Sequence, residues 1–464
     1  MVALSAYRAR LDGLLADLAA EHRVPGAACG VLVGNEVEIA TTGVVNVATG
    51  VPVTPATLFQ IGSITKLYTA SLVQQAAAAG VVSLDEPVRA QLQEFMVADP
   101  GATIEITPRH LLTHTSGIEG DHLIDTGWNP DALQRYMGTL AALGQIHATD
   151  ETYSFCNTGY AVAGRLLEVA TGEHFDRVLR RRLTRPLGCR STLTLPQHAL
   201  LHSVAVGHVQ TPETEPVRQS RWVLTRSNGP MGGVMAPPGE LLAFARLHLA
   251  RGRAADGTDL LAPADVEAMQ HPHVESHVPG EEQAVGWTVR RWGDEVCLAQ
   301  DADTFGQRAF LRVVPARNLA LCVMTNSPTG GALGQQLVER LAADLAETTA
   351  GEAAPAGGAP APRAGRAPGV TAGHAGTYDR LHQRIVVTVP GGGQPVVRTE
   401  PSGMLRALGV GTHELDLRAL DGEGRVFDTV DPTTGMRELV VFTGPPDGPR
   451  TGVYLGGRLH RRAG

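Results

Sequence analysis

Ser63 and Lys66 are the two residues of this chain whose types and spacing best fit covalent catalysis. They lie three positions apart, and residues three apart on a helix share one face, so the hydroxyl and the amine can meet. A serine hydroxyl is a weak nucleophile until a base removes its proton, and a desolvated lysine can have a pKa low enough to be that base. The spacing therefore predicts a serine nucleophile with a lysine base. The alternative is an N-capping serine beside a solvated lysine.

The basic residues of the sequence draw further attention to Lys66. Of the 39 lysine and arginine residues in the 464-residue chain, 38 are arginine, and Lys66 is the only lysine. Arginine keeps its proton at any usable pH, whereas lysine can release it. The pair also stands where a strand pattern gives way to a helix pattern, and N–H groups at the start of a helix can stabilise an oxyanion.

Five segments downstream of Lys66 carry further motif-like residues: RHLLTHTSGI at 109–118, NTGY at 157–160, VGW at 285–287, FLRVVP at 310–315 and MTN at 324–326. Together with the Ser-x-x-Lys pair, they resemble the serine β-lactamase and DD-peptidase superfamily, in the branch of class C β-lactamases, alkaline D-peptidases and related esterases and transacylases. The resemblance covers roughly residues 5–345. It implies an α+β fold, in which an antiparallel sheet is flanked by helices and joined to a helical subdomain, and an acyl-enzyme formed on Ser63.

The second motif of that family, Tyr-x-Asn, is altered in this chain. Alignment on Asn157 places Phe155 where the family has tyrosine, and a phenyl ring cannot carry a proton. Tyr153 could substitute only if the segment shifted its register, because alternate positions point the same way only in an extended chain. By the same resemblance, Asn157 is expected to hydrogen-bond Lys66 or the substrate; the alternative is a turn-forming asparagine.

The third family motif, Lys-Thr-Gly or His-x-Gly, is altered as well. Gln300 stands at the position of the cation or imidazole, and Ala302 stands at that of the glycine. The missing positive charge weakens recognition of a substrate carboxylate, although Gln300 can still donate hydrogen bonds. The resemblance also implies that the backbone N–H of Asp303 forms the oxyanion hole together with that of Ser63.

The elements that must position these residues are mixed helices and strands. A helix over 4–18 and a β-hairpin over 27–46, which turns around Gly34-Asn35, come first. Helical patterns then run over 67–79, 108–113, 130–143, 159–170, 238–250 and 334–346, and strand patterns over 285–292, 308–314 and 319–326. Strands at both ends of this region imply one sheet assembled from distant segments.

Composition divides the chain into two folded parts. Residues 1–350 are expected to form the β-lactamase-like domain, and residues 351–371, nearly all Ala, Pro, Gly and Arg, are predicted to be a linker. Short β-rich runs follow at 384–389, 395–399, 414–420, 425–430, 438–443 and 452–460. Their spacing predicts a small antiparallel barrel or sandwich over residues 372–464, and of the two we expect a lipocalin-like β-barrel domain.

Charge and composition argue against several classes of function. The net charge is −8 and the longest basic run is three arginines at 180–182, which argues against nucleic-acid binding. No long apolar stretch and no leader-like start are seen, so we expect a cytoplasmic protein without membrane contact. Five cysteines without a CxxC pair suggest neither disulfides nor zinc. His271, His273 and Glu275 would fit a metal only in an extended chain with a further ligand, so no metal or cofactor is expected.

The sequence as a whole predicts a serine hydrolase or acyltransferase acting on an ester, thioester or amide. The missing tyrosine favours substrates whose leaving group departs easily, and hence an esterase-like or biosynthetic acyl transfer, as in transacylases and penicillin-binding-protein-type thioesterases. The partner is then a small-molecule or peptidyl acyl substrate, free or carrier-bound. The alternatives are β-lactamase, D-aminopeptidase or DD-peptidase activity, and a catalytically impaired binding protein on the same scaffold. Oligomeric state is left open.

Overall fold

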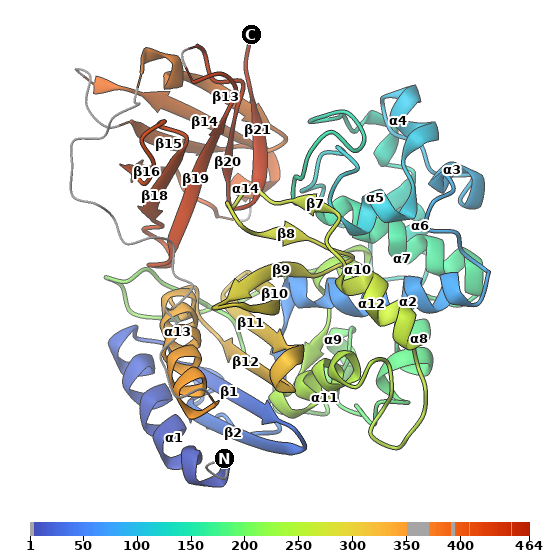
Figure 1. Cartoon of the computed structure of the whole chain (residues 1–464), viewed down its shortest axis with the longest axis vertical. Coiled ribbons are helices and arrows are strands. Elements are labelled where there is room, and N and C mark those ends of the chain that lie inside the picture. The colour runs from blue at the N-terminus through green and yellow to red at the C-terminus, as the bar shows by residue number, and fades with distance from the viewer. Residues whose placement is uncertain (1–3, 350–370, 391–394, 408, 447) are drawn as a thin grey trace.

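The computed structural model describes residues 4–349, 371–390, 395–407, 409–446 and 448–464. The predicted linker at 351–371 lies outside the described residues, except for Thr371. The described chain forms a sheet with helices on both faces, a helical subdomain beside it, and a second, all-β part at the C-terminal end (Figure 1). The predicted fold class is therefore confirmed.

A central antiparallel sheet of eight strands holds the first part together. The strand order is β2-β1-β12-β11-β10-β9-β8-β7, so the first hairpin pairs with a strand from far along the chain, as predicted. The strands are β1 (Gly26–Val33), β2 (Glu36–Gly43), β7 (Val274–Glu275), β8 (Glu282–Gln283), β9 (Thr288–Trp292), β10 (Glu295–Thr304), β11 (Gln307–Val314) and β12 (Leu319–Thr325). The β1–β2 hairpin turns at Gly34-Asn35, where Gly34 has the positive φ that glycine tolerates best.

Helices cover both faces of this sheet. On one face lie α1 (Leu4–Glu21) and α13 (Gly330–Thr349), whose leucines pack against β1, β11 and β12. The other face is covered by α2 (Thr65–Ala78) and α11 (Pro238–Leu249). Because β12 is covered from both sides, its continuous apolar sequence is buried along its whole length.

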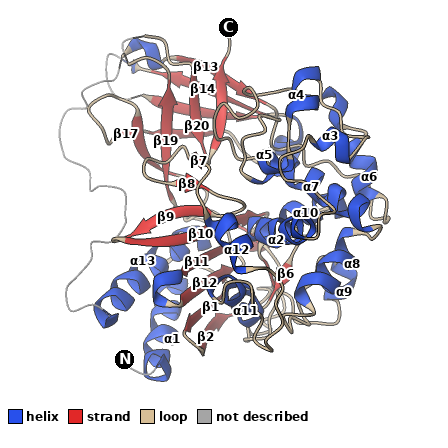
Figure 2. Cartoon of the chain, turned by 45° about the vertical axis from the view of Figure 1, so that its right-hand side comes forward, coloured by secondary structure: helices blue, strands red, loops and turns tan. Residues whose placement is uncertain are grey.

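The remaining helices build the subdomain on the α2 side, seen in blue beside the red sheets in Figure 2. They are α3 (Val88–Gln91), α4 (Pro100–Glu105), α5 (Pro108–Leu112), α6 (Ala132–Met137), α7 (Asn157–Thr171), α8 (Phe175–Leu179), α9 (Pro196–Ala199), α10 (Gly229–Gly232) and α12 (Pro263–Gln270). The longest of them, α7, packs on α2, α5, α6, α8 and α10. Its N-cap is Cys156, whose Sγ accepts the N–H of Gly159, and it ends at Gly172 in the left-handed conformation.

Two pairs of short strands connect the subdomain to the sheet. Strand β3 (Phe59–Gln60) pairs with β6 (Met235–Ala236), and β4 (His208–Val209) pairs with β5 (Val217–Arg218). Strand β3 lies directly before the segment that contains Ser63.

The C-terminal part is a nearly closed antiparallel barrel of nine strands in the order β16-β15-β14-β13-β21-β20-β19-β18-β17. The strands are β13 (Gly376–Arg380), β14 (Gln383–Thr388), β15 (Val396–Pro401), β16 (His413–Asp416), β17 (Arg418–Ala419), β18 (Val426–Val430), β19 (Arg437–Thr443), β20 (Gly452–Leu455) and β21 (Arg458–Arg462), with the short helix α14 (Gly403–Ala407) after β15. The two edge strands, β16 and β17, are separated only by Leu417, which brings the edges together. The barrel interior is filled by apolar side chains that include Tyr378, Phe427 and Phe442.

The barrel is docked on the helical subdomain through β20 and β21. The hydroxyl of Tyr454 donates to the backbone oxygen of Tyr153 at 2.6 Å, and the N–H of Phe155 donates to the backbone oxygen of Gly457 at 3.0 Å. Arg461 forms an ion pair with Glu151 at 2.7 Å. The segment that carries the altered Tyr-x-Asn motif is therefore held by the barrel.

Several elements differ in extent from the sequence patterns. The run at 452–460 is a hairpin rather than one strand, because Gly456 and Gly457 both have positive φ and turn the chain. The pattern at 130–143 is divided into α6 and a 3-10 turn over 140–142. Strand β9 begins only at Thr288, because Gly286 has a φ of +83°, and β13 has no counterpart among the predicted strands. In the parts of the chain that the structure describes, no helix has the length and apolarity needed to cross a bilayer.

Candidate active site

Ser63 lies in a 3-10 turn, Gly62–Ile64, that leads directly into α2. The preceding Gly62 has a φ of +46°, and a Cβ at this position would come within 2.8 Å of Thr304 Cγ2. Only glycine therefore allows the turn to approach strand β10 this closely. Ser63 itself is half-buried, so its hydroxyl remains reachable.

Lys66, on the first turn of α2, is buried and makes three polar contacts. Its Nζ lies 3.0 Å from Ser63 Oγ, 2.7 Å from Asn157 Oδ1 and 2.8 Å from the backbone oxygen of Met231. The amide and carbonyl oxygens can only accept hydrogen bonds, whereas the serine hydroxyl can also donate one. A neutral amine can thus donate to both oxygens and turn its lone pair toward the Ser63 hydroxyl.

The electrostatic surroundings of Lys66 favour that neutral form. Burial and, next, the positive charge of Arg458 lower the pKa of Lys66 to about 7, although Asp121 and Cys156 act in the opposite direction. Desolvation has this sign because burial disfavours the charged form of an amine. The amine is therefore available as a base near neutral pH.

Asn157, the first residue of α7, connects Lys66 to a buried ion cluster. Its Nδ2 donates to Asp121 Oδ1 at 2.8 Å, which leaves Oδ1 of Asn157 to face Lys66. Asp121 also accepts from Arg380 at 2.5 Å and from Arg458 at 2.7 Å, two arginines of the barrel. Although burial opposes ionisation, these two guanidinium groups hold the pKa of Asp121 far below its ordinary range. The carboxylate stays ionised and fixes the asparagine amide.

Phe155 places its ring directly beside Lys66. The ring centroid lies 4.6 Å from Lys66 Nζ and 4.7 Å from the guanidinium carbon of Arg458. The imidazole of His114 stacks on the same ring at 4.7 Å, and its Nδ1 accepts the backbone N–H of Cys156. The neighbour of the lysine is thus an apolar ring between cations, with no group that can transfer a proton.

Tyr153 lies in the interface between the subdomain and the barrel. Its ring packs with Tyr454 and Leu459, and it stacks on His277 with ring centroids 6.0 Å apart. Burial raises the pKa of its hydroxyl. Among the interactions of the described residues, none joins Tyr153 to Ser63 or Lys66.

Strand β10 presents an open edge to the serine. Its pairing with β9 ends at Ala299, so the following residues pair only with β11. A Cβ on Gly62 would lie 3.2 Å from the backbone oxygen of Asp303, and a residue's N–H and C=O point to the same side of a strand. The N–H of Asp303 therefore faces the Ser63 turn.

Gln300 is buried on the face of β10 that also carries Ala302 and Thr304, since side chains alternate along a strand. Its Nε2 donates to the backbone oxygen of Asp301 at 3.3 Å. Asp301 points to the other face, where it pairs with Arg290 and Arg312. The side chain of Asp303 is 59% exposed and pairs with Arg308 at 3.2 Å.

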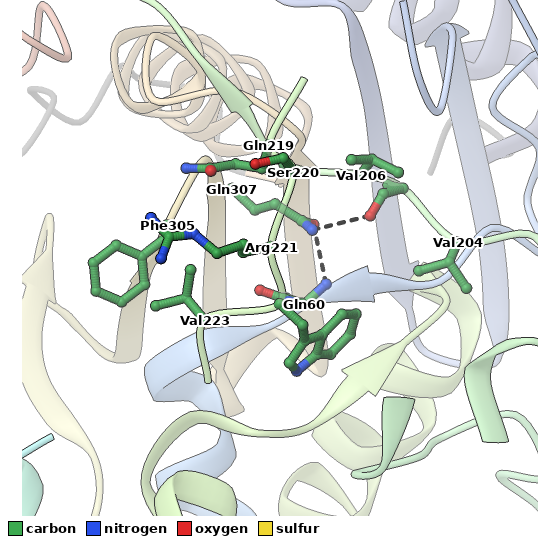
Figure 3. A pocket seen from close by; sticks show the side chains of 12 residues that line it. Gln60, Val204, Val206, Gln219, Ser220, Arg221, Val223, Phe305 and Gln307 are labelled. Carbon is green, nitrogen blue, oxygen red and sulfur yellow. Dashed lines mark hydrogen bonds between the residues drawn. The ribbon is translucent and has the colours of Figure 1, made fainter. Parts of the chain in front are cut away.

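A small cavity of about 210 Å³ lies beside β3 and is lined in part by Gln60 and Gln307 (Figure 3). The side chain of Gln307 crosses it, accepting the N–H of Gln60 at 3.1 Å and donating to the backbone oxygen of Ala205 at 3.0 Å. Phe305 and Trp222 contribute aromatic rings to its wall. These hydrogen bonds hold β3, the strand that precedes Ser63 in the chain.

Sequence reasoning placed Ser63, Lys66, Asn157 and Phe155 in one site, and the structure brings these four together. The sequence patterns do not point to four further groups of the site, which are Asp121, Arg380, Arg458 and the backbone oxygen of Met231. For Arg458, the Gly456-Gly457 pair directly before it could have indicated a turn, but the predicted strand at 452–460 includes both glycines. Within the described ranges, no group of three or more His, Cys, Asp or Glu residues is arranged to hold a metal ion.

Comparison with known proteins places this site in a family context. The family model described as "Beta-lactamase" matches residues 11–346. Penicillin-binding protein 4 of Amycolatopsis lactamdurans is 38% identical over 334 residues, which cover 71% of this chain and 88% of that protein. Esterase EstB of Burkholderia gladioli is 30% identical over 200 residues, 39% of this chain and 50% of that protein.

The structural comparison extends over the barrel as well. The crystal structure of SurE matches with a TM-score of 0.76 and 27% identity, covering 99% of this chain and 100% of that chain. The crystal structure of SurE with D-Leu matches with a TM-score of 0.72 and 26% identity over the same shares. Both parts of the described fold therefore occur together in another solved protein.

Proposed function

The chain belongs to the β-lactamase family, and from this membership we propose that it is a serine acyl-transferring enzyme in which Ser63 carries the acyl group and Lys66 moves the protons. One observation carries the proposal: a buried amine lies 3.0 Å from the serine hydroxyl while two acceptor oxygens hold its remaining hydrogens. A nucleophile and base within hydrogen-bond reach, with the base oriented by further groups, is the arrangement that covalent catalysis needs.

The reaction would proceed through two transfers at Ser63. Lys66 takes the hydroxyl proton as Oγ attacks the substrate carbonyl, and the N–H groups of Ser63 and Asp303 hold the developing oxyanion. Collapse of the intermediate breaks the bond to the leaving group, and the Lys66 ammonium gives its proton to a leaving group that needs one or otherwise releases it to solvent. Water or an amine then attacks the acyl-enzyme with the neutral Lys66 as base, and Lys66 returns that proton to Ser63 Oγ as the acyl group departs.

The preferred substrates are esters or thioesters, because Phe155 offers no proton to a leaving group. A thiolate or activated alkoxide departs without protonation, whereas an amine leaving group requires it. We therefore favour an esterase-like or biosynthetic acyl transfer, with a peptidyl or small acyl donor that is free or carrier-bound. The crystal structure of SurE with D-Leu supports a substrate that contains a D-residue.

A second candidate is β-lactamase, D-aminopeptidase or DD-peptidase activity. The 38% identity to a penicillin-binding protein favours it. Against it stand Phe155 and the uncharged Gln300, since β-lactam and stem-peptide substrates present a carboxylate that a cation recognises best. A third possibility, a binding protein without turnover, predicts that no acyl-enzyme forms.

Intact-protein mass spectrometry tests these readings. The protein is incubated with a fluorophosphonate and, separately, with a p-nitrophenyl ester and a thioester of one D-amino acid, D-Leu. We expect one adduct on Ser63, absent in Ser63→Ala and present in Ser402→Ala, an exposed serine of the barrel. No adduct on the unaltered protein between pH 6 and 9 would reject the enzyme and favour the binding protein. Adduct from benzylpenicillin but from neither ester nor thioester would favour the second candidate.

A further inference from the structure

Of the two barrel arginines that bind Asp121, Arg458 also lies against the Phe155 ring beside Lys66. This residue begins β21 directly after the Gly456-Gly457 turn, whose backbone accepts the N–H of Phe155. Its Nε donates to Asp121 Oδ2 at 2.7 Å, and a second nitrogen lies 3.3 Å from Asp121 Oδ1. The side chain is 28% exposed, so it is only partly covered by the interface.

A continuous chain of hydrogen bonds joins this arginine to the serine. Arg458 binds Asp121, Asp121 accepts from Asn157, Asn157 accepts from Lys66, and Lys66 lies against Ser63. A carboxylate can only accept hydrogen bonds, so Asp121 forces the NH₂ group of Asn157 toward itself and the amide oxygen toward Lys66. Each partner thereby determines the orientation of the next.

The charge of Arg458 also acts on Lys66 directly. Lys66 Nζ and the guanidinium carbon of Arg458 both lie within 5 Å of the Phe155 ring centroid. Like charges at short range in a buried site disfavour each other's ionised form. Arginine does not release its proton, so the lysine responds.

We propose that Arg458 is a positioning residue for the acylation step: through Asp121 and Asn157 it fixes the Lys66 amine against Ser63, and its charge keeps that amine unprotonated. The barrel is then part of the catalytic unit and not only an appended domain. This inference rests on the function proposed above.

The other groups that face Lys66 are few and can be named. Asp121 and Cys156 favour its charged form, while His114, which packs on Phe155, is itself held neutral by burial and by Lys66. Tyr160 presents its ring at 5.5 Å and donates its hydroxyl proton to the backbone oxygen of Leu112. Arg380 donates a hydrogen bond to Asp121 Oδ2. The described cluster around the lysine thus holds two guanidinium groups and one carboxylate.

Substitution of Arg458 should move the pH profile of acylation. In Arg458→Met, Asp121 and Arg380 balance each other, and Lys66 loses the charge that opposes its protonation. We expect the midpoint of the acylation rate against pH to rise by about one unit, so that the rate at pH 7 falls about fivefold while the plateau at high pH changes little. Arg458→Lys keeps the charge and should keep the midpoint.

Two further variants separate this role from docking. Arg461→Met removes another arginine of β21 that holds Glu151 in the same interface, and it should leave the profile unchanged. The double variant Asp121→Asn, Arg458→Met restores the local charge, because Arg380 remains as the one cation, and it should return the midpoint toward the original value. Circular dichroism and thermal unfolding identify any variant that fails to fold; if Arg458→Met does, the double variant and Arg458→Lys provide the comparison.

The outcomes are distinct. An unaltered protein that forms no Ser63 adduct at any pH refutes both the proposed function and this inference. A rate that falls equally at all pH values in folded Arg458→Met refutes the effect of the Arg458 charge and leaves only its orienting contact, whereas an equal midpoint shift in Arg461→Met refutes the role of Arg458 altogether. Neither result bears on the proposed function. A loss confined to KM of one substrate would mean that the arginine binds substrate and does not position the base.

Discussion

The Nζ atom of Lys66 lies 4.6 Å from the centre of the Phe155 ring, so the only lysine of the chain packs against a side chain that has no proton to give. In the proposed reaction, Lys66 must therefore act both as the base that activates Ser63 and as the acid that serves the leaving group.

Lys66→Arg should abolish acylation although the positive charge is kept. A guanidinium cannot release a proton to become a base, so the Ser63 hydroxyl stays protonated. Loss of a general base lowers rates by about 10²–10⁴-fold. Stopped-flow measurement of the p-nitrophenolate burst, with Ser402→Ala as control, gives this rate. Activity within a few-fold of the unaltered protein would reject Lys66 as the base.

Phe155→Tyr should increase turnover of substrates with poor leaving groups. The added hydroxyl would stand beside Lys66 and could carry a proton to an amine leaving group. A positioned proton donor contributes about 10²-fold or more, so the amide rate should rise toward that extent while the thioester rate changes little. Steady-state rates for an amide and a thioester of the same acyl group provide the measurement. An unchanged amide rate would mean that another group already donates the proton.

Acylation should depend on pH with a midpoint near 7. The pKa of Lys66 is lowered to about 7, chiefly by burial. Below that pH the amine is protonated and cannot accept the serine proton, so the rate falls about tenfold per unit; above it the rate reaches a plateau. Single-turnover acylation between pH 5.5 and 9 measures this profile. A rate that is flat down to pH 5.5 would contradict the assignment.

Asn157→Ala should affect both activity and stability. The substitution removes an acceptor of Lys66 and a donor to Asp121, both buried. Leaving such groups unpaired costs about 1–3 kcal/mol of the free energy of unfolding, and acylation should fall at least tenfold because the amine is no longer oriented. Urea denaturation and burst kinetics measure the two effects. Asn326→Ala, another buried asparagine, which binds Val44 and Val45 instead, should lose stability but keep acylation within a few-fold.

Gln300→Lys should change which substrates are preferred. The side chain lies on the face of β10 that meets the Ser63 turn, so an ammonium there could pair with a substrate carboxylate. We expect kcat/KM for a carboxylate-bearing ester to rise about tenfold relative to its methyl ester, since hydrogen bonds between charged groups contribute about 1.5–3 kcal/mol. A ratio that does not change would place Gln300 outside the substrate site.

The features that sequence could predict are local ones. Ser63 and Lys66 are one helical turn apart, and the turn at Gly34-Asn35 joins two strands that are adjacent in the chain, so short spacing is enough to find both. The strands β1, β2, β9, β11 and β12 and most strands of the barrel follow from apolar periodicity, which each strand carries within itself, whereas β7, β8, β10 and β13 have no counterpart among the predicted strands.

The features that sequence could not predict depend on distant partners. In the sequence, nothing distinguishes Asp121 from other acidic loop residues. Its role depends on ion pairs with Arg380 and Arg458 of the barrel, and sequence periodicity does not link residues of two different folded parts. The pattern at 452–460 predicts one continuous strand, because the residues on both sides of Gly456-Gly457 are strand residues and only the structure shows that the two glycines turn the chain. The location of this turn decides where Arg458 points, and that depends on how the barrel docks.

The separation between Asp121 and Arg458 is 337 residues. At a ribosome that adds about 5–20 residues per second, the nucleophile and its lysine leave the exit tunnel tens of seconds before the arginine that completes their surroundings. Contacts of such high order also form late in folding, because a long loop must be closed first. The newly made N-terminal part therefore holds Asp121 without Arg458 until the barrel has docked, and the fully connected site is a product of the last long-range step of folding.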